Sequence, residues 1–177
     1  MDVLKKLVKK RKLKDYLIYA GVIALCIFID LLTKAIAVKH LEPIYTQPII
    51  KDVIHFTYHE NPGAAFGILR DAPWVFNTVS TIAIGALLVY LFLGHADSWL
   101  RASSLMLICG GGIGNMVERL AQGYVVDFID FRLIDFAIFN MADTFVCVGA
   151  GLLILSLILE IVEEAKKKKH DVDGEKE

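Results

Sequence analysis

Four windows of the sequence are apolar on every side of a helix and carry few charges: 16–38, 75–93, 99–117 and 141–162. A helix that crosses a bilayer needs about 20 such residues, because the hydrocarbon core is about 30 Å thick and a helix rises about 1.5 Å per residue. A water-soluble helix would instead show one apolar stripe and a polar back. The pattern predicts an integral membrane protein, mostly α-helical, with a bundle of four transmembrane helices.

The basic residues lie mainly at the two ends of the chain. Of the 19 lysines and arginines, seven fall within 5–14, and an unbroken run of four occupies 166–169. Short loops rich in lysine and arginine stay in the cytoplasm, so we expect both termini to be cytoplasmic. The loops 39–74 and 118–140 carry few basic residues and are expected outside.

Composition agrees with a membrane protein. The chain has 177 residues, of which 56% are apolar, and a net charge of −1. Soluble domains are about 45–50% apolar, and the balanced charge argues against a nucleic-acid partner. The three cysteines fall inside predicted spans and are interpreted as small apolar residues: Cys26, Cys109 and Cys147. Residues 1–165 are expected to form one membrane-embedded domain, and 166–177 a charged, disordered cytoplasmic tail.

The N-terminus has a second interpretation. A basic stretch, the apolar run 16–29 and the triplet Ala35-Ile36-Ala37 imitate a cleavable secretory signal. Asp30 and Lys34 interrupt that pattern, and the full window is long enough to span a membrane. We therefore expect the first helix to remain in the mature protein.

The loop 39–74 is the largest segment expected outside the membrane. It holds all four prolines of the chain, and its part 49–58 is rich in β-branched and aromatic residues. Such a stretch favours a strand or hairpin, so we expect a small extracytoplasmic β-sheet on the membrane surface. The glycines and prolines that follow predict a mobile or interfacial segment at 61–73.

Ionisable residues inside spans are costly and are functional candidates by default. Here the polar candidates lie in the first, third and fourth spans and the loop 118–140, all towards the outer side: Asp30, Lys34, Asn115, Glu118, Arg119, Asp127, Asp130, Asp135 and Asp143. Asp30 and Lys34 are spaced i, i+4, as an ion pair on one helix face requires. We interpret them as a structural pair whose members neutralise each other and reach outward to the interface.

Two segments are rich in small residues. The run 110–114 (GGGIG) permits close helix packing or leaves a crevice in which a substrate can lie. It is not a phosphate loop, because no strand precedes it and no Lys-Ser/Thr pair follows. The segment 61–67 (NPGAAFG) combines turn chemistry with small residues that fit closely against a neighbour.

Asp127 and Asp143 can form a pair with acid–base chemistry. Two carboxylates in a poorly solvated site share one proton, so that one member deprotonates a water while the other donates to a carbonyl oxygen. By spacing alone, Asp130 and Asp135 compete for this role. The sequence lacks an H-E-x-x-H metal site and a G-x-S-x-G nucleophile elbow. Three loop histidines are interpreted as surface residues: His40, His55 and His59.

Five segments, in this order, resemble those of the lipoprotein signal peptidase (signal peptidase II) family of bacterial inner membranes. They are 30–34 (DLLTK), 61–67 (NPGAAFG), 110–119 (GGGIGNMVER), 125–128 (VVDF) and 139–143 (FNMAD). The resemblance implies an aspartic endopeptidase that cuts the signal peptide from diacylglyceryl-modified prolipoproteins just before the lipidated cysteine. It places the enzyme in the inner membrane, with the active site facing the extracytoplasmic side.

By position in these motifs, Asp127 and Asp143 match the catalytic pair of the family. The resemblance also assigns substrate-binding or site-ordering roles to Asn61, Gly63, Gly114, Asn115, Arg119, Asn140, Asp30 and Lys34. It implies no metal and no cofactor, since acid and base are both side chains, and a monomer whose partners are prolipoprotein signal peptides and membrane lipid. Asp130 and Asp135 match no catalytic position.

Two residues depart from the family pattern. Gly112 stands where the family often has alanine, which affects the shape of the crevice. Glu118 stands where the family often has aspartate, and it keeps the negative charge. Two other classes of protein fit the sequence less well. A transporter would place its charges near the midplane on broken helices, often in inverted repeats. A scaffold would leave Asp127, Asn140 and Asp143 without a purpose.

Overall fold

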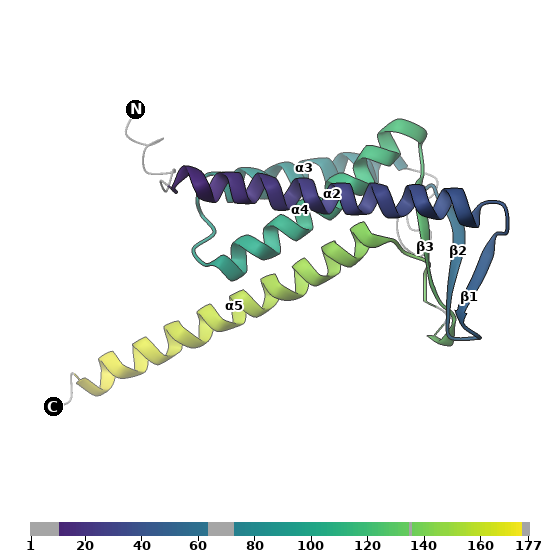
Figure 1. The fold of residues 1–177 in the computed structure, drawn as a ribbon. Coiled ribbons are helices and arrows are strands. Elements are labelled where there is room, and N and C mark those ends of the chain that lie inside the picture. The colour runs from purple at the N-terminus through teal and green to yellow at the C-terminus, as the bar shows by residue number, and fades with distance from the viewer. Residues whose placement is uncertain (1–10, 64–72, 135, 175–177) are drawn as a thin grey trace.

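The computed structural model describes residues 11–63, 73–134 and 136–174 (Figure 1). This part of the chain forms helices at one end and a small sheet at the other. In chain order the elements are α2 (Leu13–Leu41), β1 (Thr46–Ile50), β2 (Ile54–Asn61), α3 (Pro73–Phe92), α4 (Trp99–Gln122), β3 (Val125–Phe131), the 3-10 turn η2 (Arg132–Ile134) and α5 (Met141–Gly174).

Each predicted window is occupied by one helix of the structure. Among the described residues, Leu13–Leu41 and Met141–Lys168 are long and apolar enough to cross a membrane, and Asn77–Phe92 is a shorter apolar helix. α4 is more polar, because Arg101 lies near its start and Glu118 near its end. The mostly helical fold is confirmed, whereas the four-span topology stays a prediction. Figure 1 shows α2 beginning and α5 ending at the end opposite the sheet, as that topology requires.

Local sequence sets the ends of α4 and its packing. Ser98 caps the first turn by accepting from the Arg101 amide, and Gly123 ends the helix with a left-handed φ of 85°. A side chain at Gly111 would place its Cβ 2.3 Å from the carbonyl oxygen of Ala142 on α5. The glycine run therefore serves close helix packing, one of the two functions expected of it.

The cysteines are free thiols, as expected. Cys26 and Cys109 are buried between α2 and α4, and Cys147 is exposed on α5. A side chain at Gly110 would meet the Cβ of Cys26 at 2.6 Å. Cys26 thus acts as a small residue where α2 and α4 approach closely.

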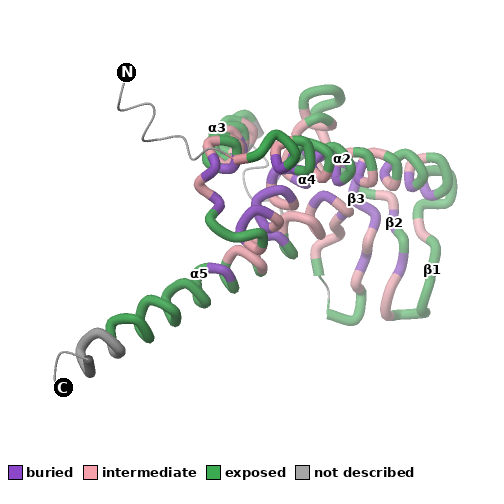
Figure 2. Tube along the Cα trace, turned by 60° about the vertical axis from the view of Figure 1, so that its left-hand side comes forward, coloured by how far each residue is buried: buried purple, intermediate pink, exposed green. Residues whose placement is uncertain are grey.

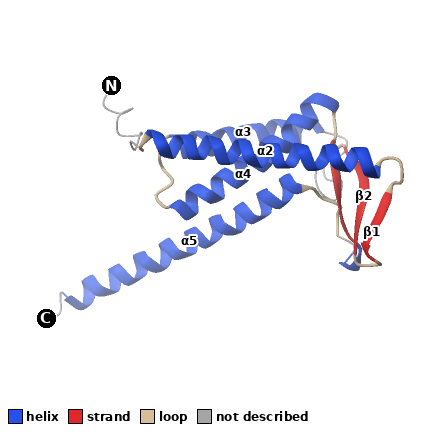
Figure 3. Ribbon diagram, viewed as in Figure 1, coloured by secondary structure: helices blue, strands red, loops and turns tan. Residues whose placement is uncertain are grey.

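The sheet is antiparallel with the order β1-β2-β3. β1 and β2 form the hairpin expected at 49–58, with Thr46 paired to Thr57. β3 comes from the loop 118–140, where no strand was predicted, and pairs Asn61 with Val125 and His59 with Asp127. In Figure 3 the strands lie across the end of the helices. Most of the predicted mobile segment, 64–72, lies outside the described residues.

The charged tail differs from its prediction. Residues 166–174 continue α5 as a helix instead of forming a disordered segment. Glutamate and lysine are good helix formers, and Glu163 and Glu164 stand four residues before Lys167 and Lys168, the order that stabilises a helix. Figure 2 shows the second half of α5 as mostly exposed.

Candidate active site

Asn140 connects the two aspartates that the sequence singled out. It precedes α5 and is fully buried. Its Oδ1 accepts from the Asp143 amide at 3.0 Å, while Oδ2 of Asp143 accepts from the Asn140 amide at 3.1 Å. This reciprocal arrangement is a capping box at the start of a helix. Nδ2 of Asn140 donates to Oδ1 of Asp127 at 2.6 Å. One side chain thus caps α5 and binds Asp127 on β3.

Both oxygens of the Asp127 carboxyl group accept a hydrogen bond. Asp127 is 1% exposed, and its second oxygen, Oδ2, accepts from Nδ2 of Asn61 at 2.8 Å. Asn61 lies at the end of β2, and its own Oδ1 accepts from the Gly63 amide at 3.0 Å. The β2–β3 pairing and the turn after β2 therefore fix the orientation of the Asp127 carboxyl group.

The environment of Asp127 favours its protonated form. Burial, together with the charge of Asp143, raises the pKa of this carboxyl to about 7, against the hydrogen bonds from Asn61 and Asn140. Desolvation disfavours the charged form of a carboxyl group, and so does a nearby like charge. At neutral pH, Asp127 therefore exchanges a proton readily.

Lys34 is the centre of a buried ionic network. Its Nζ lies 2.7 Å from Oδ2 of Asp30 and 2.9 Å from Oε2 of Glu118, and it donates to Oδ1 of Asn115 at 2.7 Å. The predicted pairing with Asp30 is confirmed. The expectation that the pair reaches outward is wrong, since Asp30 and Lys34 are 0% and 1% exposed. The reason is that α4 supplies two further oxygen partners for the ammonium group.

The partners of Lys34 also bind the segments that carry the aspartates. Oδ1 of Asp30 accepts from the Ala142 amide at 2.9 Å, next to Asp143. Oε2 of Glu118 accepts from the Val126 amide at 3.2 Å, next to Asp127. Nδ2 of Asn115 donates to Oδ1 of Asp143 at 2.8 Å. The network therefore joins α2, α4, β3 and α5 around the two carboxylates. Glu118 is one of the polar candidates of the sequence but not one of the site residues that the resemblance assigns, and no local pattern predicts its contact with the Val126 amide.

Gly114, Gly63 and Arg119 complete the set of predicted site residues. A Cβ at Gly114 would lie 2.6 Å from Oδ2 of Asp30, so only glycine leaves room for this carboxylate. Nη2 of Arg119 donates to the Gly63 carbonyl at 3.0 Å and ties α4 to the turn after β2. All ten site residues named from the sequence thus lie in one connected region.

A cavity of about 250 Å³ opens beside Asp143, between α3, α4 and α5. Its polar lining includes Asn115, Arg119 and Asp143, and most of its wall is apolar, with Ile84 and Val146 among the lining residues. Gly112 lines it too, and a Cβ there would lie 2.7 Å from Cδ1 of Ile84. The glycine run therefore also borders a crevice, the second function expected of it.

Asp130 has a structural environment of its own. Its Oδ2 accepts from Thr57 at 2.7 Å and from Nε of Arg132 at 2.9 Å. Burial opposes ionisation, but these hydrogen bonds and the Arg132 charge hold the pKa of Asp130 below its usual value. Asp135 lies outside the described residues.

The histidine prediction is correct for two residues. His40 and His59 are exposed, whereas His55 is buried, with Nδ1 3.3 Å from the Thr46 hydroxyl. Because β2 is the central strand of the sheet, His55 has a cross-strand neighbour on each side, Pro48 on β1 and Asp130 on β3. Among the residues that the structure describes, no three His, Cys, Asp or Glu side chains are grouped so as to hold a metal ion.

The motifs match a known family. A family model described as signal peptidase (SPase) II matches residues 22–159. The chain belongs to the signal peptidase II family. It is 44% identical over 132 residues to a lipoprotein signal peptidase of Caldanaerobacter subterraneus subsp. tengcongensis, covering 75% of this chain and 90% of that protein. It is 43% identical over 147 residues to that of Brevibacillus brevis, covering 82% and 95%.

Solved structures agree with this assignment. Two of them, each described as a bacterial membrane enzyme, share the fold of this signal peptidase II family member. One has a TM-score of 0.73 and 31% identity, covering 81% of this chain and 88% of the other. The second has a TM-score of 0.69 and 32% identity, covering 78% and 91%. The chain is therefore a peptidase and a membrane protein.

Proposed function

We propose that this protein is an aspartic endopeptidase of the bacterial inner membrane that removes signal peptides from diacylglyceryl-modified prolipoproteins. The cut falls just before the lipidated cysteine. The observation that carries the proposal is the hydrogen-bonded connection of Asp127 to Asp143 through Asn140, at the edge of a largely apolar cavity. The names of the relatives support the substrate class.

Asp127 and Asp143 divide the acid and base roles in the proposed mechanism. Asp143 lines the cavity and, as a carboxylate, takes a proton from the attacking water. Asp127, with its raised pKa, donates its proton to the oxygen of the scissile carbonyl. The tetrahedral intermediate then breaks its C–N bond. The proton held by Asp143 passes to the leaving amine, and a hydroxyl proton of the intermediate returns to Asp127 as the new carboxyl group forms. One water is consumed, and no further reactant is needed.

The surroundings of the pair suit this substrate. A signal peptide is an apolar helix, and its lipid-bearing cysteine lies where the membrane meets water. The cavity beside Asp143 is lined by residues of α3, α4 and α5 and is walled mainly by apolar side chains. The pair lies at the sheet end of the helices, which the proposed topology of four spans and cytoplasmic termini places at the outer interface (Figure 1).

A cleavage assay with matched substrates tests this function. We expect the purified full chain to cut a diacylglyceryl-modified prolipoprotein so that mass spectrometry finds the lipidated cysteine at the new N-terminus. The unmodified form of the same prolipoprotein is the control and should be cut much more slowly. Equal cutting of both forms, or a product that begins elsewhere, would refute the proposed specificity.

A further inference from the structure

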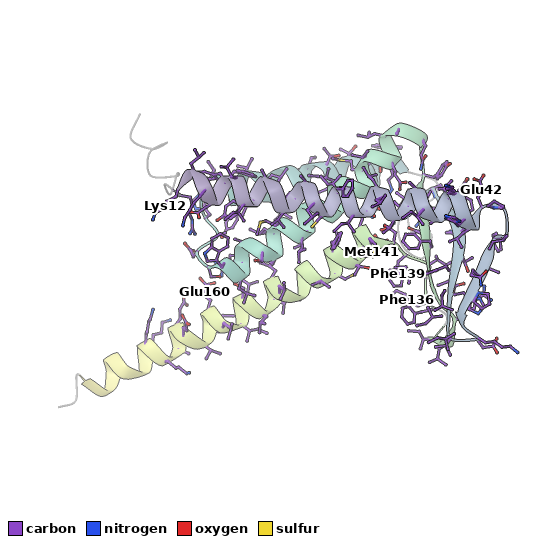
Figure 4. The ribbon with its side chains drawn as sticks, in the orientation of Figure 1. Lys12, Glu42, Phe136, Phe139, Met141 and Glu160 are labelled. Carbon is purple, nitrogen blue, oxygen red and sulfur yellow. The ribbon has the colours of Figure 1, made fainter. Side chains whose placement is uncertain are left out.

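A second cavity, of about 330 Å³, lies between the start of α4 and the second half of α5. Its polar lining includes Asp97, Arg101, Ser156, Glu160 and Glu163. Figure 4 shows Glu160 beside the start of α4, at the end of the helices opposite the sheet. No residue of this cavity takes part in the proposed cleavage.

Carboxylates outnumber cations in the lining of the second cavity. Nη2 of Arg101 donates to Oε2 of Glu160 at 2.5 Å, and Nη1 lies 3.7 Å from Oδ2 of Asp97. Within the described part of the chain, Glu163 has no ion-pair partner. Three carboxylates against one guanidinium group leave the lining with a formal charge of −2. A negative cavity wall favours a cationic ligand.

Two buried polar groups of the same lining have no hydrogen-bond partner among the described residues. One is Nε of Arg101, whose side chain is 9% exposed. The other is the hydroxyl of Ser156, a residue that is 5% exposed. A buried polar group without a hydrogen bond costs free energy. Both groups can donate to an oxygen, so the cavity fits a ligand that carries acceptor oxygens as well as a positive charge.

The second cavity is aligned with the cavity at the active site. On α4, Arg101 and Asn115 are 14 residues apart, and on α5 so are Val146 and Glu160. Fourteen residues are close to four helical turns, so each pair shares one face of its helix. Asn115 and Val146 line the cavity beside Asp143, whereas Arg101 and Glu160 line the second one. The two cavities therefore border the same seam between α4 and α5, about 21 Å apart at about 1.5 Å per residue.

A signal peptide carries positive charge at this distance from its cleavage site. It begins with a basic n-region, which an apolar stretch of about 7–15 residues separates from the cleavage site. As a helix, that stretch is about 10–23 Å long, and the residues of the cleavage site add a few ångströms. A peptide that is cut beside Asp143 thus brings its n-region to the level of Arg101 and Glu160. The backbone carbonyls ahead of the peptide's helix are free to accept hydrogen bonds.

Building on the proposed function, we propose that the second cavity binds the basic n-region of the prolipoprotein signal peptide. Glu163 and Asp97 supply carboxylates for its lysine or arginine side chains, and Arg101 and Ser156 donate to its backbone carbonyls. The n-region held here sets how far the peptide reaches along the seam. The lipidated cysteine is thereby placed in register with Asp143.

Peptide binding to charge-matched variants tests this site. The probe is a fluorescent, diacylglyceryl-modified signal peptide with two lysines in its n-region, and the comparison peptide has glutamines there. Every chain carries Asp127→Asn, so that no cleavage intervenes, and fluorescence anisotropy in non-ionic detergent gives the dissociation constant. We expect Glu163→Gln to weaken binding of the lysine peptide about two- to fivefold, as for loss of a partly exposed ion pair, and to leave the glutamine peptide unchanged.

The neighbouring glutamate provides the matched control. Glu164 does not line the cavity, so Glu164→Gln should bind both peptides as the parent chain does. An exchange of charge gives a second reading, since Glu163→Lys should bind a peptide with n-region glutamates more tightly than the parent chain does.

Other results would overturn the site. Equal weakening by Glu163→Gln and Glu164→Gln would show a general electrostatic field at this end of the helices and no site. Equal binding of the lysine and glutamine peptides by the parent chain would mean that something other than the n-region, such as a lipid headgroup, occupies the cavity. Both results leave the proposed function standing, whereas a parent chain that binds neither peptide would refute that function as well.

Discussion

Replacing Asp127 or Asp143 with asparagine should lower the cleavage rate by about 10²–10⁴-fold, the range expected for loss of general acid–base catalysis. Asparagine keeps the size of the side chain and one acceptor oxygen, but it cannot exchange the proton. Each aspartate accepts two hydrogen bonds, one at each oxygen. Asparagine keeps one of these two hydrogen bonds and loses the other, so the variants should lose some stability and stay folded, which circular dichroism of the purified proteins checks.

Asp130→Asn is the matched control for this pair. Asp130 lies on the same strand and is also buried, but it binds Thr57 and Arg132 and not Asn140. We expect it to cleave near the wild-type rate. An inactive Asp130→Asn together with an active Asp127→Asn would show that the catalytic pair has been assigned wrongly.

Lys34→Met should destabilise the fold more than any single change at the surface. Methionine has a similar length but no charge, so it leaves the carboxylates of Asp30 and Glu118 buried without their counterion. Breaking a buried ion pair by removing one partner costs about 3–5 kcal/mol. Thermal unfolding of the protein in detergent measures the loss.

Two further variants test whether the stability lost in Lys34→Met comes from the buried carboxylates that it leaves without a counterion. Lys39→Met, on the exposed end of the same helix, is the control and should unfold near the wild-type temperature. Adding Asp30→Asn to Lys34→Met removes one stranded charge and should restore part of the stability. If Lys34→Met unfolds at the temperature of Lys39→Met, the network does not hold the helices together.

The helices could be predicted from the sequence because a helix that crosses lipid requires a long apolar stretch of residues. An uninterrupted apolar window of sufficient length marks a candidate span, and each of the four windows is helical in the structure. The hairpin was predictable for a similar reason, since β-branched and aromatic residues cluster between turn residues at 49–58. These features depend on residues close together in the chain.

Features that depend on distant residues could not be predicted. β3 is apolar apart from Asp127 and Asp130, and only its pairing with β2 makes it a strand. The burial of Lys34 depends on Asn115 and Glu118, which lie on a different helix. The family resemblance located the polar site residues, but only the structure shows that Asn140 joins the aspartates by capping α5.

The central claim is that Asp127 holds the proton of the pair and donates it during cleavage. The most direct measurement is kcat/KM for a diacylated prolipoprotein across the range of about pH 5 to 9, because this ratio reports the pKa values of the free enzyme. Since burial raises the pKa of Asp127 to about 7 and the acid form is the active one, kcat/KM should fall as the pH rises through this value. The fall should approach tenfold per pH unit above it. A ratio that rises through pH 7 would make Asp127 the base and would contradict the account.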